Sequence, residues 1–349
     1  MPIETQRSNY TKRRDGLWGT SPEQTSPYIP AHLQIEQVKG NSLGAVQDFG
    51  CYEETTILSK GNRIVLSIWV VKPLAATVLF LPGTMTHPLF YRELLEGLGQ
   101  AGFNVVGVHF VGHGKSPRVS GFTFEDLLQN ARDALSYALH RFGGKVVVLG
   151  SSQGGILAMA LAASDRRLSA VFAHNILDPE IPESLEVTRF PRRLEPHHRR
   201  LVDGVRRLAA VFPQFPVPLN FYLDPLRITR KPRLLRRLAT DPLGLRSYPL
   251  RFLASLFSAD LSGMYDGSIG CPVVVITSRG DPLFPFANTE NLYRRIVAPS
   301  KELMVFDCGI HLIFNECLGS VLPQLVERLH RHLDTADAEF HRDRLCAPA

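Results

Sequence analysis

Residues 145–163 read KVVVLGSSQGGILAMALAA, and this stretch is the starting point for interpreting the rest of the chain. The β-branched run 146–149 is typical of a strand buried on both faces of a parallel sheet. The run 156–163, rich in Ala, Leu and Met, favours a helix. Between them lies a glycine-rich turn that matches G-x-S-x-G with Ser152 at its centre. This order predicts a sharp strand-to-helix turn that exposes the Ser152 hydroxyl as a nucleophile.

Sequence context separates Ser152 from two competitors. The same five-residue pattern occurs at 40–44 around Ser42, but the run 33–39 before it alternates like a half-exposed strand and no helical run follows. Ser42 is therefore not expected to be a nucleophile. Ser151 is adjacent to Ser152 but lies off-centre in the motif, so the two serines have to be compared directly.

Composition bounds the class of protein. The chain has 349 residues, of which 44% are hydrophobic, and this is enough for a sizeable core. The basic N-terminal residues precede no apolar stretch of a secretory signal, and no run approaches the ~20 apolar residues of a membrane span. The five cysteines form an odd set without CxxC spacing, which favours free thiols and a cytoplasmic location.

Strand and helix patterns alternate along most of the chain. After an irregular arm at 1–45, a hairpin is expected from 52–60 and 62–72. The other expected strands are 76–81, 103–109, 146–149, 168–176, 273–276 and 303–306, and the expected helices are 87–100, 124–142, 156–163, 288–296 and 318–333. This alternation predicts an α/β fold with a mostly parallel, doubly wound sheet.

One segment interrupts the alternation. Residues 178–268 are Pro-rich and carry basic helical patterns without strands between them. We therefore expect a helical cap inserted after the sixth strand, with the α/β core formed by 46–177 and 269–335. The polar residues 336–349 are expected to form a C-terminal tail.

A serine hydroxyl needs a base to remove its proton, and the base needs an orienting carboxylate. In strand-turn-helix nucleophile folds the chain order is serine, acid, histidine. Asp281 follows the strand 273–276, and His311 follows the strand 303–306, so both occupy the required positions. Asp178, after the sixth strand, remains the reserve acid.

Other polar residues near strand ends are assigned less direct roles. Asp307 is too close to its strand and is expected to cap a loop. His87, His113 and His174 also lie near strand ends, so position alone does not single out His311. The conjunction of three residues in the right order carries the prediction.

An acyl-transfer site also needs backbone N–H groups that hold a developing oxyanion. The N–H of Gln153, directly after Ser152, is one candidate. The second is expected from the loop after the third strand, Leu81 to Met85. Pro82 has no N–H, so we predict Thr84, with Met85 as the alternative.

Five short motifs resemble the monoacylglycerol lipase and lysophospholipase (serine aminopeptidase-like) group of α/β-hydrolases. They are LFLPG at 79–83, FVGHGKS at 110–116, GSSQGG at 150–155, PVVVITSRGDPLFP at 272–285 and GIHLIFNE at 309–316. The resemblance implies an α/β-hydrolase fold over most of 52–335 apart from the insertion. It gives Ser152, Asp281 and His311 the triad roles, and it gives Thr84 and Gln153 the oxyanion amides.

The resemblance also implies a structural role for His113, and the chain departs from the group at two positions. Pro82-Gly83 stands where the group usually has His-Gly, and His109 stands where it usually has Asp before the Gly-His-Gly turn. Both departures bear on the substrate more than on the triad. The resemblance implies a chemistry and does not identify a substrate.

The insertion combines aromatic and basic residues. Its large apolar residues either line an acyl tunnel or form a core of the cap itself; they are Phe212, Phe215, Phe221, Tyr222, Leu223, Phe252, Leu256 and Phe257. Met85, Phe221 and Phe257 are the expected substrate contacts. Between Arg189 and Arg237 there are 13 Arg or Lys and three acidic residues, which indicates either a solvated face or a docking surface for anionic lipid or substrate. No nucleic-acid recognition motif accompanies this charge.

These observations predict a serine hydrolase that cleaves carboxylic esters through an acyl-enzyme on Ser152. A lipid-like substrate, of the monoacylglycerol or lysophospholipid type, is favoured, and no metal or organic cofactor is expected. A thioesterase or acyltransferase would use the same triad. A hydrolase-fold ligand receptor would keep the triad and turn over slowly. The sequence does not indicate the oligomeric state.

Overall fold

Within the part of the chain that the computed structural model describes, residues 35–36 and 51–345 with side chains for 51–333, nine strands form one sheet. The strands are β1 (Ile35–Glu36), β2 (Cys51–Ser59), β3 (Asn62–Val70), β4 (Thr77–Leu81), β5 (Asn104–His109), β6 (Val146–Ser151), β7 (Ala170–His174), β10 (Val273–Ser278) and β11 (Lys301–Phe306). They lie in the order β1-β2-β3-β5-β4-β6-β7-β10-β11. Pairing is antiparallel from β1 to β5 and parallel from β5 to β11, which confirms the predicted fold class.

The composition of the strands explains this sheet. Every residue of β4, β5, β6 and β7 is buried, as expected for apolar runs covered by helices on both faces. The antiparallel hairpin of β2 and β3 turns through Lys60 and Gly61, with φ of 46° and 78°. Two consecutive positive φ angles suit the twist of a tight hairpin.

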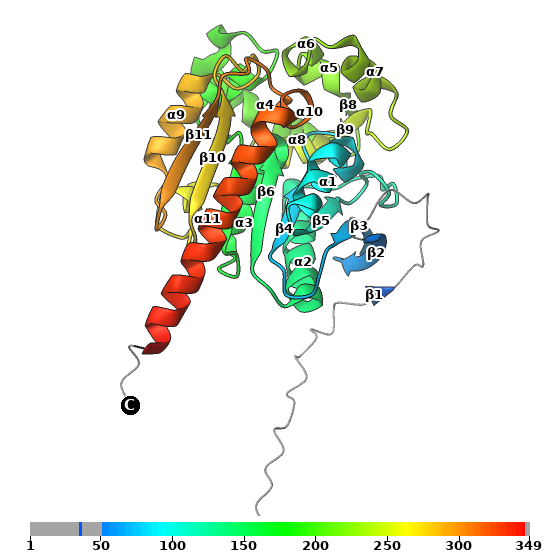
Figure 1. The fold of residues 1–349 in the computed structure, drawn as a ribbon. Helices are drawn as coiled ribbons and strands as arrows, with labels where there is room; N and C mark the ends of the chain where they lie inside the picture. Colours follow the sequence, from blue (N-terminus) through cyan, green and yellow to red (C-terminus); the bar gives the residue numbers. More distant parts are fainter. Residues whose placement is uncertain (1–34, 37–50, 346–349) are drawn as a thin grey trace, which may run out of the picture. The chain divides into compact units, whose positions relative to one another are not determined.

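Helices cover both faces of the sheet (Figure 1). They are α1 (Arg92–Gln100), preceded by the short η1 (Pro88–Tyr91), α2 (Phe124–Phe142), α3 (Gln153–Ser164), α9 (Phe286–Arg295) and α11 (Leu318–Leu345). Helix α1 packs against α11, and α2 packs against α3. Because β5 and β6 lie on opposite sides of β4, the chain reverses its winding direction there, and ligands of such sheets bind at the carboxyl ends of the strands beside that point.

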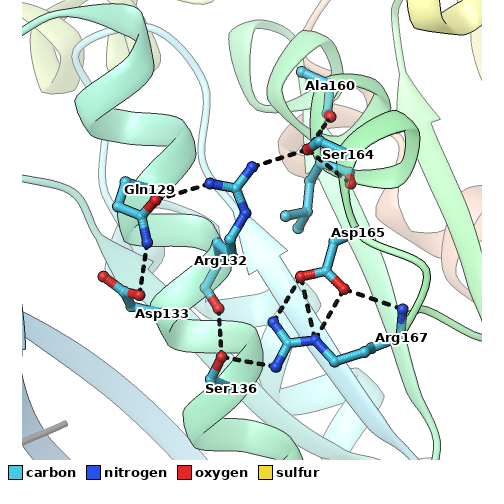
Figure 2. Close-up of polar contacts among 9 residues, drawn as sticks. Gln129, Arg132, Asp133, Ser136, Ala160, Ser164, Asp165 and Arg167 are labelled. Atoms are coloured by element: carbon cyan, nitrogen blue, oxygen red, sulfur yellow. Dashed lines mark hydrogen bonds and ion pairs between the residues drawn. The ribbon is translucent and has the colours of Figure 1, made fainter. Parts of the chain in front are cut away.

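Polar contacts fix the C-terminal end of α3 to α2 (Figure 2). Arg132 of α2 donates to Ser164 Oγ at 3.0 Å, and Arg167 donates to Ser136 Oγ of α2 at 2.9 Å. Arg167 also forms an ion pair with Asp165 at 2.6 Å. Burial alone would raise the pKa of Asp165, but the hydrogen bonds and charge of Arg167 outweigh it and lower the pKa. The helix that follows the candidate nucleophile is therefore anchored at its far end.

The segment 178–268, the expected cap, lies between β7 and β10. Its elements are η2 (Pro182–Val187), η3 (Arg192–His197), α4 (His198–Val211), β8 (Pro216–Pro218), α5 (Leu219–Tyr222), α6 (Pro225–Ile228), α7 (Pro232–Thr240), β9 (Ser247–Pro249), α8 (Leu250–Leu256) and η4 (Ser262–Met264). The small sheet of β8 and β9 was not expected from the sequence. Both strands have only three residues and contain prolines, so no alternating pattern reveals them.

Two further features differ from the sequence expectations. Helix α11 continues to Leu345 instead of ending at Leu333, because no proline or glycine interrupts its polar second half. A short helix, α10 (Ile313–Glu316), follows the loop that carries His311. The expected arm at 1–45, including Ser42, lies outside the described residues apart from β1.

Candidate active site

The turn between β6 and α3 holds Ser152 in a strained backbone conformation. Ser152 has φ 54° and ψ −118°, a region that residues with a side chain rarely adopt. A β-carbon at Gly150 would lie 2.0 Å from the carbonyl oxygen of Gly154, and one at Gly154 would lie 2.0 Å from the carbonyl oxygen of Leu81. Both motif positions therefore require glycine, and the close packing of strand and helix determines where Ser152 lies.

Three loops bring Ser152, His311 and Asp281 together. Ser152 follows β6, Asp281 follows β10 and His311 follows β11, all at the carboxyl edge of the parallel sheet. Ser152 Oγ lies 3.0 Å from His311 Nε2, and His311 Nδ1 lies 3.0 Å from Asp281 Oδ2. All three residues are buried. The arrangement has the geometry in which an imidazole accepts a proton from a serine while a carboxylate orients it.

The Asp281 carboxylate accepts three hydrogen bonds besides its contact with His311. Oδ1 accepts the N–H groups of Leu283 and Phe284 at 2.7 and 3.1 Å, and Oδ2 accepts Nδ2 of Asn175 at 3.0 Å. Burial alone would raise the pKa of Asp281. The electrostatic interaction and hydrogen bond with His311, together with the N–H of Phe284, outweigh burial and lower the pKa to about 2. Asp281 is therefore ionised and able to stabilise a protonated His311.

Asn175 is a site residue that the sequence analysis missed. It is fully buried, directly follows β7 and has φ 35°. The available signal was its position, since it is a polar residue at the carboxyl end of the strand next to β6. The neighbouring His174 packs its ring 5.6 Å from that of His311, and burial lowers the pKa of His174 to about 3, so His174 is neutral.

The competing residues have other partners. Asp178 accepts hydrogen bonds from the Tyr265 hydroxyl and the Glu180 N–H, and Asp307 pairs with Arg279. Ser151 is the buried last residue of β6. His113 Nδ1 donates to the carbonyl oxygen of Val111 within its own turn at 2.8 Å, and its Nε2 lies 3.1 Å from the hydroxyl of Tyr248.

The loop after β4 borders the nucleophile. A β-carbon at Gly83 would lie 3.4 Å from Ser152 Cβ. The N–H of Met85 donates to the hydroxyl of Tyr248 from the cap at 2.7 Å. Tyr248 in turn contacts Gln153 Oε1 at 3.2 Å, and burial raises the pKa of its phenol far above the usual value. Since the Met85 amide is engaged, the Thr84 amide is the better oxyanion candidate in this loop, beside the Gln153 amide that begins α3.

The expected substrate contacts fall into three environments. Met85 is buried in the loop after β4, and Phe257 is half-buried at the end of α8. Phe221 is 66% exposed, so it does not line an enclosed tunnel as expected. Part of the apolar set is buried in a core that is continuous with that of the sheet; these residues are Tyr222, Leu223, Phe252 and Leu256, and Phe252 packs against Phe122 with ring centroids 5.3 Å apart.

The sheet order, the inserted cap and the serine elbow define an α/β hydrolase. The chain belongs to the serine aminopeptidase (S33) family, whose sequence profile matches residues 72–317. This confirms the resemblance noted in the motifs. A comparison with curated protein sequences gives no match.

Solved structures with this fold include two lipases. The monoacylglycerol lipase of Paleococcus ferrophilus superposes with a TM-score of 0.64 at 23% identity, covering 77% of this chain and 99% of that chain. A soluble variant of the monoglyceride lipase of Saccharomyces cerevisiae, bound to a substrate analogue, gives 0.64 at 17% identity, covering 84% and 99%. Est1E of Butyrivibrio proteoclasticus, with bound ferulic acid, gives 0.57 at 17% identity, covering 80% and 99%.

The described residues hold no candidate metal site and no candidate membrane span. No group of three or more His, Cys, Asp and Glu side chains in 51–333 lies together in a way that would hold a metal ion. Among the described helices, none is both long and apolar enough to cross a membrane. Four cysteines in the same range, Cys51, Cys271, Cys308 and Cys317, are free thiols.

Proposed function

We propose that the protein is a serine hydrolase that cleaves carboxylic esters through an acyl-enzyme on Ser152. The observation that carries this proposal is the hydrogen-bonded series Ser152, His311, Asp281, with both distances at 3.0 Å. His311 takes the Ser152 proton as Oγ attacks the ester carbonyl, and it then protonates the leaving alcohol. Water, activated by the same imidazole, releases the acid from the acyl-enzyme.

In this proposal the oxyanion forms beside two backbone amides. Gln153 supplies the first N–H, at the positive end of α3. Thr84 supplies the second, because Tyr248 occupies the N–H of Met85. Asp281 orients His311 and stabilises its charged form, and Asn175 supports Asp281.

The favoured substrates are esters with a lipid-like acyl chain, of the monoacylglycerol or lysophospholipid type. Exposed apolar residues of the cap support this choice; they include Leu208, Val211, Phe212, Phe215 and Phe221. Turnover should be measured on p-nitrophenyl esters, monoacylglycerols, lysophospholipids and acyl-CoA. Faster turnover of acyl-CoA than of any oxygen ester would make the protein a thioesterase. Labelling by a fluorophosphonate with negligible turnover of all four classes would make it a ligand receptor.

The cap is also proposed to contact anionic membranes. Helix α4 carries exposed basic residues, Arg199, Arg200, Arg206 and Arg207, directly before exposed apolar residues at its C-terminal end. Basic side chains attract anionic headgroups, and the apolar residues insert below them. Raising the salt concentration should then weaken activity on anionic vesicles and leave activity on soluble neutral esters unchanged. Equal salt dependence on both substrates would exclude membrane docking. A cytoplasmic location is part of the same proposal.

A further inference from the structure

Arg227 of the cap connects two segments that are far apart in the chain. It lies in α6, is half-buried and, in the part of the chain that the structure describes, donates hydrogen bonds to four backbone carbonyls. Nε and Nη2 reach the carbonyls of Pro282 and Leu283 at 2.7 and 3.2 Å. Nη1 and Nη2 reach those of Thr188 and Glu186 at 2.9 and 2.6 Å. Its guanidinium therefore holds the turn after Asp281 against the beginning of the cap.

The same turn binds the candidate catalytic acid from its other side. The peptide units 282–283 and 283–284 offer their carbonyls to Arg227 and their N–H groups to Asp281 Oδ1. A peptide whose carbonyl is bonded to a cation becomes a stronger N–H donor, because hydrogen bonds in series polarise each other. Two peptide units thus lie between a guanidinium and a carboxylate, and each charge strengthens the contact to the other.

The turn also contacts the candidate base. The ring of Phe284 stacks on that of His311, with centroids 5.4 Å apart and planes 6° apart. Displacement of the residues 281–284 would therefore disturb the carboxylate that orients His311 and the ring that packs on it. Small displacements of this kind are costly, since about 1 Å of misplacement can reduce a rate ~10²-fold.

We propose that Arg227 is a positioning residue for the triad, which fixes the turn 281–284 and thereby makes the geometry of Asp281 and His311 dependent on the cap. This inference rests on the proposed hydrolase function. It concerns a residue that makes no contact with the reacting atoms and acts through two peptide units.

A second arginine of the cap provides a matched control. Arg189 donates to the carbonyl of Asn220 at 2.7 Å, so it also joins cap segments through a carbonyl, and within the described residues it makes no hydrogen bond to the turn 281–284. Both arginines line a cavity of about 420 Å³ at the edge of the cap, together with Glu186, Asp224 and Pro285. A small cation in solution therefore has access to the position of the Arg227 side chain.

The test compares Arg227→Met with Arg189→Met in the full chain, using steady-state hydrolysis of a soluble ester and the rate of fluorophosphonate labelling. Arg227→Met should lower kcat about 10- to 100-fold with little change in KM, and it should slow labelling to a similar extent. Millimolar guanidinium should restore part of both rates. Arg189→Met should change neither rate, and guanidinium should not affect it.

Several results would overturn the inference. Wild-type kcat in Arg227→Met would do so, as would equal losses in both variants or a loss that guanidinium does not relieve. Should Arg227→Met fail to fold, Arg227→Lys retains the charge but cannot bridge both segments, and wild-type kcat in that variant would also contradict the proposal. Ser152→Ala is measured in parallel. If it retains full activity, the hydrolase function itself is wrong; if only Arg227→Met is unaffected, this inference alone fails.

Discussion

The nucleophile turn and the cap are built on opposite principles. In α3, which begins after Ser152, nearly every residue is buried and none is charged. In α4 and α7 of the cap, most residues are exposed and arginines are frequent, and α7 has no buried residue. The turn is defined by steric exclusion at Gly150 and Gly154, whereas the cap joins the core through apolar packing, as between Phe252 and Phe122, and through polar contacts of single side chains.

The turn at Ser152 and the cap differ in how accurately their side chains have to be positioned. The covalent step needs one hydroxyl held to within a fraction of an ångström, and close packing provides this. In the proposed function, recognition of a substrate by the cap tolerates more variation, and most residues of α4 and α7 are exposed. Contacts of cap residues with core loops are the exception; they include Tyr248 with Met85, Asp241 with His87, and Arg227 with Pro282.

The largest effect is expected from removal of the Ser152 hydroxyl. Ser152→Ala should lower kcat by ~10⁵- to 10⁶-fold, because only one hydroxyl carries the covalent step. Ser151→Ala should have a mild effect. Thermal unfolding should show that both variants are folded, and ester hydrolysis should separate them. Inactivation by Ser151→Ala but not by Ser152→Ala would show that Ser151 is the nucleophile.

The second test removes the charge of the acid and keeps its shape. Asp281→Asn should reduce kcat about 10³- to 10⁴-fold, because His311 loses its orientation and the partner of its charged form. Asp178→Asn should do much less, since Asp178 is bonded to Tyr265. Steady-state kinetics on the same ester would decide, and the reverse ranking of the two variants would move the acid to the loop after β7.

The third test concerns the pH dependence of stability in the core. Burial lowers the pKa of His113 to about 4 and that of His174 to about 3. The unfolded chain takes up these protons below its ordinary pKa of about 6.5, whereas the folded protein does so only near pH 4 and 3, so acid favours unfolding in between. Each histidine should lower the free energy of unfolding by up to about 2 kcal/mol at about pH 5. Urea midpoints that stay constant from neutral pH down to this value would contradict the burial of neutral imidazoles.

The fourth test addresses the cap. If its apolar residues hold an acyl chain, kcat/KM should rise with chain length by at most about fourfold per CH₂. Phe257→Ala should flatten this rise for long chains and leave acetyl esters nearly unchanged. Phe221→Ala should have the smaller effect, because Phe221 is exposed. A preference for acetyl over octanoyl esters in the wild type would exclude a lipid-like substrate.

The smallest effect is expected at the far end of α3. Ser164→Ala removes the acceptor of Arg132 (Figure 2) and should reduce the free energy of unfolding by about 1 kcal/mol. It should leave kcat unchanged, since the Gly-rich turn determines the position of Ser152. Denaturant unfolding and ester hydrolysis measure the two quantities. A kcat loss without a loss of stability would show that the anchor of α3 acts on the site.

The sequence predicted the core well because its signals are local. Helix α2 has the predicted bounds because Thr123 begins it with a capping box and Gly143 ends it with φ 65°. The serine, the acid and the base each follow a strand, so the topology alone places their loops at one edge of the sheet. The distances between the three side chains could not be predicted from the sequence. They support the catalytic triad, which is a proposal.

What the sequence could not predict depends on contacts between distant segments. Asn175, Tyr248 and Arg227 have no motif, and their partners lie 106, 163 and 55 residues away in the chain. The cap was recognised only by the absence of strand and helix alternation, so its small sheet and the exposure of Phe221 were missed. Local sequence patterns indicate periodicity and turns, but they do not indicate which loops contact each other in the fold.

The hydroxyl of Tyr248 has a practical consequence for protein engineering. It occupies the Met85 amide and meets Gln153 Oε1, so the loop that borders the nucleophile is completed by a residue of the cap. A chimera that receives its cap from a relative must therefore supply a hydroxyl at this point, or the loop will carry an unsatisfied buried amide. Libraries that randomise 178–268 to change substrate preference should keep Tyr248 and Arg227 fixed, and selection can then act on the exposed apolar positions.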